Sequence, residues 1–139
     1  MERRDFLKTA AAVTGILTIG SISKVSANPG MDFTGIIYTK KNPGKWADKV
    51  GSHVPKVSID GKKITVTTKH VMTEKHYIVR HTLVASNGKV IGEKVFYPTD
   101  KEAVSTYELY DELPAGYKGK LYATSFCNLH DLWVAEISV

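Results

Sequence analysis

The sequence predicts an all-β fold, an antiparallel β-sandwich of about seven strands and immunoglobulin-like type. Two turn signals, Asp60-Gly61 and the stretch 86–89, each separate runs rich in β-branched and aromatic residues. Within 63–68, Ile64, Val66 and Thr68 alternate with other residues, as in a half-buried strand. No long helical pattern and no internal repeat competes with this interpretation.

The strands are expected as short segments in chain order: 56–59, 63–68, 77–85, 90–97, 104–110, 120–126 and 132–139. The preceding stretch, 28–52, contains several Pro and Gly residues and is expected to be irregular, with at most a helical turn near 45–50. The apolar residues at 90–91 and 95–97 are expected to contribute to the core. Pro114-Ala115-Gly116 is expected to form a turn.

Residues 1–27 have the features of a targeting segment. Arg3-Arg4 begins a twin-arginine pattern, an apolar stretch follows at 10–22, and Val25-Ser26-Ala27 offers small residues for cleavage. The apolar stretch is short and rich in Ala, Thr and Gly, so no membrane span is expected in the mature form, although a retained N-terminal anchor is the alternative. We therefore expect a twin-arginine signal peptide at 1–27, a single domain at 28–139, and a periplasmic or other extracytoplasmic location.

Charge excludes one class of partner. The full chain has 19 basic and 14 acidic residues, and residues 1–27 hold four of the basic and two of the acidic ones. The remaining domain is left with a net charge of +3, and its lysines are scattered and not grouped with aromatic residues. No nucleic-acid partner is expected, whereas a mild positive charge favours a small anion.

The histidines and the single cysteine suggest a metal site. Cys127 cannot form an intrachain disulfide and lies three positions before His130; His53, His70 and His76 lie upstream in turn-like surroundings. Thiolate and imidazole together suit iron, copper or zinc. A buried core cysteine is the alternative for Cys127 alone. The fifth histidine, His81, lies inside an expected strand and receives no role.

Three segments resemble the motifs of superoxide reductases, most closely the single-iron neelaredoxin type. They are His53-Val54-Pro55, the stretch from His70 to Ile78, and the stretch from Cys127 to Trp133. The resemblance covers about residue 45 to the C-terminus, and the four-cysteine module of desulfoferrodoxins is missing. It implies an immunoglobulin-like sandwich and one mononuclear, solvent-facing iron with His53, His70, His76 and His130 as nitrogen ligands and Cys127 as the sulfur ligand. Asn128 and the backbone near Leu129 are candidates for hydrogen bonds to that sulfur.

The family usually has Glu-Lys directly before the first ligand histidine, and this chain has Gly51-Ser52 there. Lys49 is our candidate catalytic residue in place of that lysine, with Lys69 and Lys75 as alternatives, and Ser52 is a candidate for holding a water molecule. Two further departures are Val71, where proline is frequent, and Asp131, where glycine is frequent.

The resemblance implies one-electron reduction of superoxide to hydrogen peroxide, with an external electron donor such as a rubredoxin-like protein, and a homo-oligomer. A non-catalytic iron-binding sensor or electron carrier of the same fold is the main alternative. A blue-copper carrier fits less well, because an axial methionine after His130 is missing. A purely structural sandwich would explain Cys127 but not the three motifs.

Overall fold

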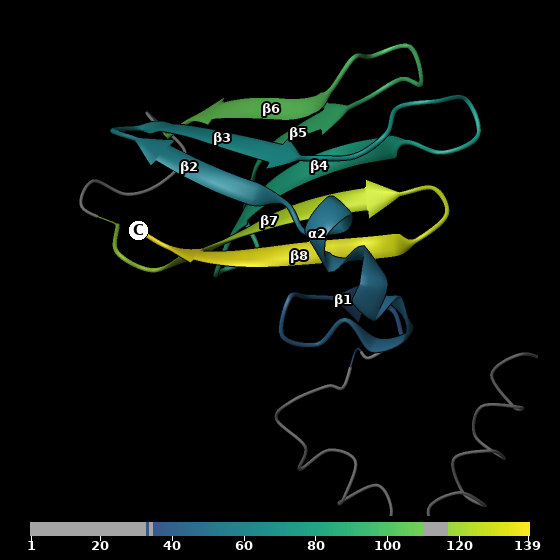
Figure 1. The fold of residues 1–139 in the computed structure, drawn as a ribbon. Helices are drawn as coiled ribbons and strands as arrows, with labels where there is room; N and C mark the ends of the chain where they lie inside the picture. The colour runs from purple at the N-terminus through teal and green to yellow at the C-terminus, as the bar shows by residue number, and fades with distance from the viewer. Residues whose placement is uncertain (1–32, 34, 110–116) are drawn as a thin grey trace, which may run out of the picture. The chain divides into compact units, whose positions relative to one another are not determined.

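The computed structural model of the 139-residue chain describes residues 33, 35–109 and 117–139. Within these residues the chain forms two sheets packed as a sandwich (Figure 1). The elements follow one another as β1 (Ile37–Tyr38), the 3-10 helix η1 (Gly44–Lys49), α2 (Val50–His53), β2 (Lys56–Asp60), β3 (Lys63–Thr68), β4 (Ile78–Ala85), β5 (Val90–Val95), β6 (Ala103–Glu108), β7 (Lys120–Cys127) and β8 (Asp131–Ser138). The expected signal peptide at 1–27 and the expected turn at 114–116 lie outside the described residues.

One sheet has five strands in the order β1-β8-β7-β4-β5, and the other has three in the order β2-β3-β6. All pairs are antiparallel except β1 with β8, which run parallel. The all-β prediction is confirmed, and the seven expected strands appear with shifts of a few residues at their ends. The eighth strand, β1, was not predicted.

Both predicted hairpin turns are confirmed. In the β2–β3 hairpin Asp60 pairs with Lys63, and Gly61 takes a φ of +58°, which a residue without Cβ adopts at little cost. In the β4–β5 hairpin the Ala85 amide donates to the Lys89 carbonyl at 2.9 Å. These tight turns hold β2 against β3 and β4 against β5 in register.

The core lies between the two sheets, and β3 supplies it through the predicted alternation of Ile64, Val66 and Thr68. Close packing across the sheets is clearest at Gly92 in β5, where a Cβ would lie 2.4 Å from the Tyr107 ring. Fully buried aliphatic and aromatic side chains complete it: Ile78, Leu83, Leu121, Trp133 and Tyr38.

The expectation that 90–91 and 95–97 would contribute to the core is largely wrong. Val90, Val95 and Tyr97 are exposed at 55%, 49% and 65%, whereas Phe96 is buried. The reason is that β5 is the edge strand of its sheet, so its side chains have no neighbouring strand on one side.

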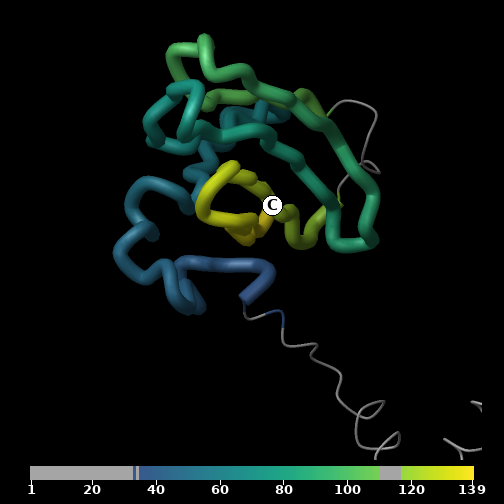
Figure 2. The backbone as a smooth tube through the Cα atoms, turned by 90° about the vertical axis from the view of Figure 1, so that its right-hand side faces the viewer, coloured from purple at the N-terminus to yellow at the C-terminus, as the bar shows by residue number. Residues whose placement is uncertain are grey.

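One end of the sandwich gathers the connections that matter for the site. The β3–β4 connection and the β7–β8 turn lie together at the right of Figure 1, beside η1 and α2, and Figure 2 views the molecule from this end. Within the described ranges, no helix is long and apolar enough to cross a bilayer.

Candidate metal centre

Five side chains from three separate parts of the chain meet at this end. They are His53 at the end of α2, His70 and His76 in the β3–β4 connection, Cys127 at the end of β7, and His130 in the β7–β8 turn. One donor atom from each lies within 4.8 Å of every other. We call these five residues the histidine–cysteine cluster. All five candidate metal ligands from the sequence are therefore brought together.

The four imidazole nitrogens form a closed ring. His53 Nε2 lies 3.1 Å from His70 Nε2, which lies 3.0 Å from His76 Nε2. His130 Nδ1 completes the ring at 3.0 Å from both His76 Nε2 and His53 Nε2. A square with such sides has its centre about 2.1 Å from each corner, a normal distance from an imidazole nitrogen to a transition metal.

Backbone oxygens select the tautomer of two of these histidines. The Nδ1 atom of His53 lies 3.2 Å from the Lys49 carbonyl and 2.8 Å from Ser52 Oγ. The Nδ1 atom of His70 lies against the Val71 carbonyl. A carbonyl only accepts, so Nδ1 of each ring carries the proton and Nε2 offers its lone pair to the cluster.

The sulfur lies on one side of this ring of nitrogens. Cys127 Sγ is 3.5 Å from His130 Nδ1 and 3.6 Å from His70 Nε2, and the residue is fully buried. His70, His76 and His130 each keep partial exposure. The histidine side of the cluster is therefore reachable from solvent while the thiol is not.

Burial favours the neutral form of His53, His70 and His76. Desolvation, followed by the neighbouring rings, lowers the pKa of His53 to about 4. Desolvation also lowers the pKa of His70 and of His76. Neutral imidazoles are the form that binds a metal, so these nitrogens are prepared as ligands at neutral pH.

Burial also raises the pKa of the Cys127 thiol, and hydrogen bonds from the backbone N–H groups of Leu129 and His130 to the sulfur oppose this shift. A buried thiolate without a cation would be costly, and a bound cation would remove that cost. Four imidazole nitrogens and one sulfur around a common centre therefore fit a transition metal such as iron.

Both expected hydrogen-bond partners of the sulfur lie beside it. The backbone near Leu129 reaches Cys127, and Cys127 Sγ lies 4.0 Å from Asn128 Oδ1. Asn128 also bridges the turn to the β3–β4 connection: its Oδ1 accepts from the Tyr77 amide at 3.0 Å, and its Nδ2 donates to the Lys75 carbonyl at 3.0 Å. This role holds the turn that carries Cys127 and His130 against the segment that carries His76.

Lys49 ends η1, directly before α2, and its Nζ lies 3.1 Å from the Asp48 carboxylate. Its positive charge contributes to the lowered pKa of His76, after desolvation and the charge of His130. Lys69 and Lys75 are exposed next to ligand candidates. Lys49 therefore contributes least among the three causes of the lowered His76 pKa, and its ammonium is paired with Asp48.

Ser52 and Gly51 occupy the positions directly before His53. The Ser52 hydroxyl donates to the Lys49 carbonyl at 3.2 Å and contacts the outward nitrogen of His53. Gly51 is exposed, and an added Cβ there would meet nothing within 4 Å. Ser52 is therefore engaged with the His53 ring on the side away from the other imidazoles.

His81, which received no role, is a core residue. It is fully buried, its Nε2 lies 2.8 Å from Thr68 Oγ1, and its Nδ1 lies 2.9 Å from Ser105 Oγ. Thr68 in turn donates to Ser125 at 2.8 Å. Both nitrogens have hydroxyl partners, so neither is available to a ligand.

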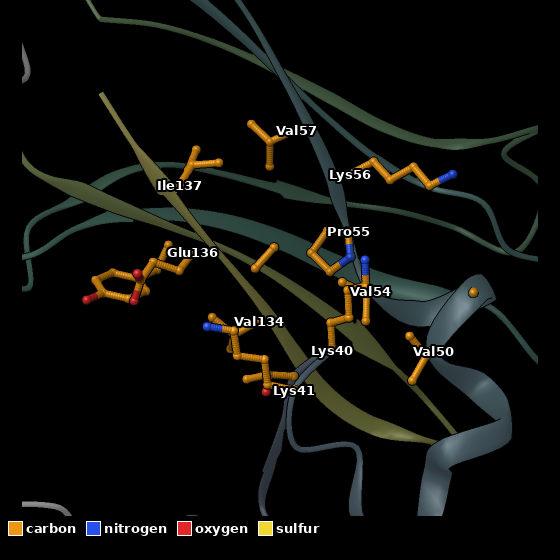
Figure 3. A pocket seen from close by; sticks show the side chains of 14 residues that line it. Lys40, Lys41, Val50, Val54, Pro55, Lys56, Val57, Val134, Glu136 and Ile137 are labelled. Carbon is orange, nitrogen blue, oxygen red and sulfur yellow. The ribbon is translucent and has the colours of Figure 1, made fainter.

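A groove of about 760 Å³ lies on the other side of α2, between β2 and β8 (Figure 3). Its apolar walls include Val54, Val57 and Ile137, with Lys40 and Lys41 at one side. None of the five cluster residues lines it, so the groove and the metal centre are different features of this end of the sandwich.

An all-β sandwich with four histidines and one cysteine gathered at one end defines a protein with a candidate metal site, and the comparisons identify its family. The desulfoferrodoxin family profile matches residues 45–136. The chain belongs to this family, and the resemblance to superoxide reductases is confirmed.

The relatives are consistent with one another. The chain is 40% identical over 48 residues to the superoxide reductase of Pyrococcus furiosus, a match that spans 34% of this chain and 39% of that protein. Among solved structures, the neelaredoxin-type superoxide reductase of Ignicoccus hospitalis is 28% identical with a TM-score of 0.64, covering 78% of this chain and 98% of its own. The one-iron superoxide reductase of Giardia intestinalis is 27% identical with a TM-score of 0.56, covering 63% and 98%.

Proposed function

We propose that this protein reduces superoxide by one electron to hydrogen peroxide at a single iron held by His53, His70, His76, His130 and Cys127. The observation that carries the proposal is the convergence of four imidazole nitrogens and one sulfur within 4.8 Å, in a chain of the desulfoferrodoxin family. Its relatives in Pyrococcus furiosus, Ignicoccus hospitalis and Giardia intestinalis are superoxide reductases.

When bound, ferrous iron supplies one electron and becomes ferric, while superoxide and two protons become hydrogen peroxide. The protein sets the conditions for this chemistry. The Cys127 sulfur is a strong donor sealed from water, and four neutral imidazoles leave the centre with a net positive charge that attracts an anion. The partly exposed histidine side admits the small substrate.

Lys49 is proposed to attract superoxide in place of the lysine that the family usually has at position 52. Its charge already acts on His76, and it lies one helical segment before His53. An ammonium at the entrance raises the local concentration of an anion, an effect that weakens with added salt.

The first experiment measures iron content and the visible spectrum of the purified protein before and after superoxide is added to the reduced form. One iron per chain, with a thiolate-to-ferric band that appears with superoxide and fades on re-reduction, is the expected result. Iron that is inert to superoxide would support the sensor or carrier alternative, and copper or no metal would overturn the proposal.

The role of Lys49 is tested by a loss and a rescue. Lys49→Met is expected to slow the reaction with superoxide about tenfold at low salt and less at high salt, with iron content unchanged. Ser52→Lys in the Lys49→Met background should restore much of the rate, because it returns an ammonium next to His53. Lys118→Met is the control, because Lys118 is exposed and precedes β7, whose other end carries Cys127. A rate unaffected by Lys49→Met would refute steering by this residue.

Three further proposals follow from the family and from the sequence of residues 1–27. The oxidised centre is re-reduced by an external donor such as a rubredoxin-like protein, the chain assembles as a homo-oligomer, and a twin-arginine leader exports it. Cell fractionation of the wild type and of an Arg3→Lys/Arg4→Lys variant tests export. Sedimentation of the purified domain tests assembly.

A further inference from the structure

We infer that Asp131 is a positioning residue that ties η1 to the cysteine turn and, through Trp46, fixes the orientation of His130. The inference rests on the proposed role of His130 as a metal ligand. It concerns a position where the sequence carries aspartate and where the resemblance leads one to expect glycine.

The backbone at Asp131 is unusual. Its φ of +66° is the only positive value among the described residues other than glycine. Glycine would adopt this conformation freely, and aspartate tolerates it better than most residues but at some cost. Asp131 also pairs with Cys127 where β7 turns into β8. A strained backbone at this point calls for a compensating interaction.

The Asp131 carboxylate makes that interaction with η1. Trp46 Nε1–H donates to Asp131 Oδ2 at 2.9 Å, and Lys45 Nζ lies 3.8 Å from the same oxygen. Trp46 and Asp131 are 85 positions apart in the sequence. The hydrogen bond from the indole therefore connects η1 to the β7–β8 turn, two segments that are distant in the sequence. The contact of Lys45 is exposed and adds little.

Trp46 meets His130 directly. The two rings lie edge to face, with centroids 4.7 Å apart and planes at 84°. His53 and His70 have their outward nitrogens fixed by backbone carbonyls, whereas His130 has no such bond among the described residues. Ligand histidines normally have a hydrogen bond on the second nitrogen that fixes the ring. Here the Trp46 ring, held by Asp131, takes over that positioning.

The same segment also contacts a second candidate ligand, His53. η1 runs from Gly44 to Lys49, and the Lys49 carbonyl lies 3.2 Å from His53 Nδ1. Asp131 therefore holds one segment that contacts both His130 and His53, which are neighbours in the ring of nitrogens at 3.0 Å. Loss of the Asp131 bond is expected to loosen both ligands together.

Three variants separate the effects of the Asp131 carboxylate, the Asp131 backbone and the Trp46 N–H donor. Asp131→Gly removes the carboxylate and relieves the backbone, Asp131→Asn keeps an oxygen acceptor for Trp46, and Trp46→Phe keeps a ring against His130 without the donor. Glu136→Gln is the control, because it removes another half-exposed carboxylate of β8 that is paired with Lys120 instead. Each is measured for the rate of iron release to a chelator and for the position of the thiolate-to-ferric band.

Asp131→Gly is expected to release iron about tenfold faster than the wild type and to shift the band, in line with the usual effect of losing a ligand's supporting partner. Trp46→Phe should behave similarly, Asp131→Asn should remain within about twofold of the wild type, and Glu136→Gln should match the wild type. Release rates for Asp131→Gly and Trp46→Phe equal to that of the wild type would overturn the inference.

A metal-free readout separates this inference from the proposed function. In the iron-free protein, the indole N–H signal of Trp46 in nuclear magnetic resonance should shift in Asp131→Gly, while that of Trp133, which donates to the His130 carbonyl at 2.8 Å, should stay in place. A wild type that binds no iron refutes the proposed function and not the Asp131 bond. An unshifted Trp46 signal refutes the Asp131 bond whatever metal is bound.

Discussion

The histidines of this molecule have the same chemistry but lie in two opposite kinds of surroundings. His81 lies in the middle of the sandwich with Thr68, Ser105 and Ser125, and both of its nitrogens have hydroxyl partners. We call these four residues the buried polar cluster. In the histidine–cysteine cluster the inward nitrogens face one another and a sulfur, with no hydroxyl between them.

The difference is one of satisfied and unsatisfied lone pairs. Hydroxyl groups can both donate and accept, so the buried polar cluster is complete as protein alone. Four imidazole nitrogens that face one another have no hydroxyl partner, and a cation at their centre would bind their lone pairs. The pKa is lowered to about 4 for both His81 and His53. The neutral His81 ring is satisfied by its hydroxyl partners, whereas the neutral His53 ring offers a nitrogen to a cation.

The largest effect is expected from His76→Ala. His76 is half-exposed and belongs to the histidine–cysteine cluster, so its loss should remove stably bound iron and lower the rate of superoxide reduction by more than about 100-fold. The iron-free stability should change by only about 0.5 kcal/mol, because the side chain is not part of the core. Iron analysis, stopped-flow kinetics and urea unfolding measure these effects. Retained iron with full activity would contradict the assignment of His76.

Metal removal should lower the free energy of unfolding through the histidine–cysteine cluster and not through His81. At a free-iron concentration of about 1,000 times the dissociation constant, binding adds about 4 kcal/mol to the free energy of unfolding. A chelator should abolish this gain in the wild type and have no effect in His76→Ala. Urea unfolding with and without chelator measures it. Equal stability with and without iron in the wild type would show that the cluster does not bind iron tightly.

Acid should destabilise the protein through His81. Burial keeps the folded-state pKa near 4 against an ordinary 6.5, so only the unfolded imidazole binds a proton between these values. This contribution is complete above pH 6.5 and is lost as the pH falls to 4, by roughly 3 kcal/mol at most. We expect the free energy of unfolding to fall less steeply between pH 6.5 and pH 4 in iron-free His81→Leu than in the iron-free wild type. Identical slopes would mean that His81 is protonated in the folded state.

Gly92→Ala tests packing that involves neither group. A Cβ at Gly92 would lie 2.4 Å from the Tyr107 ring, so the two sheets must separate locally, at a cost of about 1 to 3 kcal/mol. Iron content and the pH slope should match the wild type. Gly51→Ala is the control, because its Cβ would enter open space. An unchanged thermal midpoint in Gly92→Ala would show that Tyr107 moves aside freely.

Strands with alternating apolar and polar residues between turn residues could be predicted from the sequence. The segment 63–68 alternates apolar and polar residues between turn residues, and it forms β3 with the same bounds. β1 could not be predicted, because a two-residue strand has no period of its own and depends on its parallel partner β8. The core position expected for Val95 is wrong because apolar residues on an edge strand resemble those on a central one, and Tyr97 lies beyond the end of that strand.

The five cluster residues could be predicted from the spacing of their motifs, but their orientation could not. The nitrogen that faces inward is set in His53 by the Lys49 carbonyl and in His70 by the Val71 carbonyl. The direction of a backbone carbonyl cannot be predicted from residue types. The same holds for Asn128, whose two hydrogen bonds join segments more than 50 positions apart. The sequence shows that Asp131 stands where the family frequently has glycine, but its hydrogen bond to Trp46 could be found only in the structure.

The ring of nitrogens joins His53 to His130 across 77 positions of sequence. During synthesis the first histidines leave the ribosome long before the last hairpin, β7–β8, exists. A chain that stops between His76 and that hairpin would present three imidazoles without the sulfur and without the fourth imidazole. The proposed iron could therefore be held by all five side chains only after the last hairpin of the domain has been made.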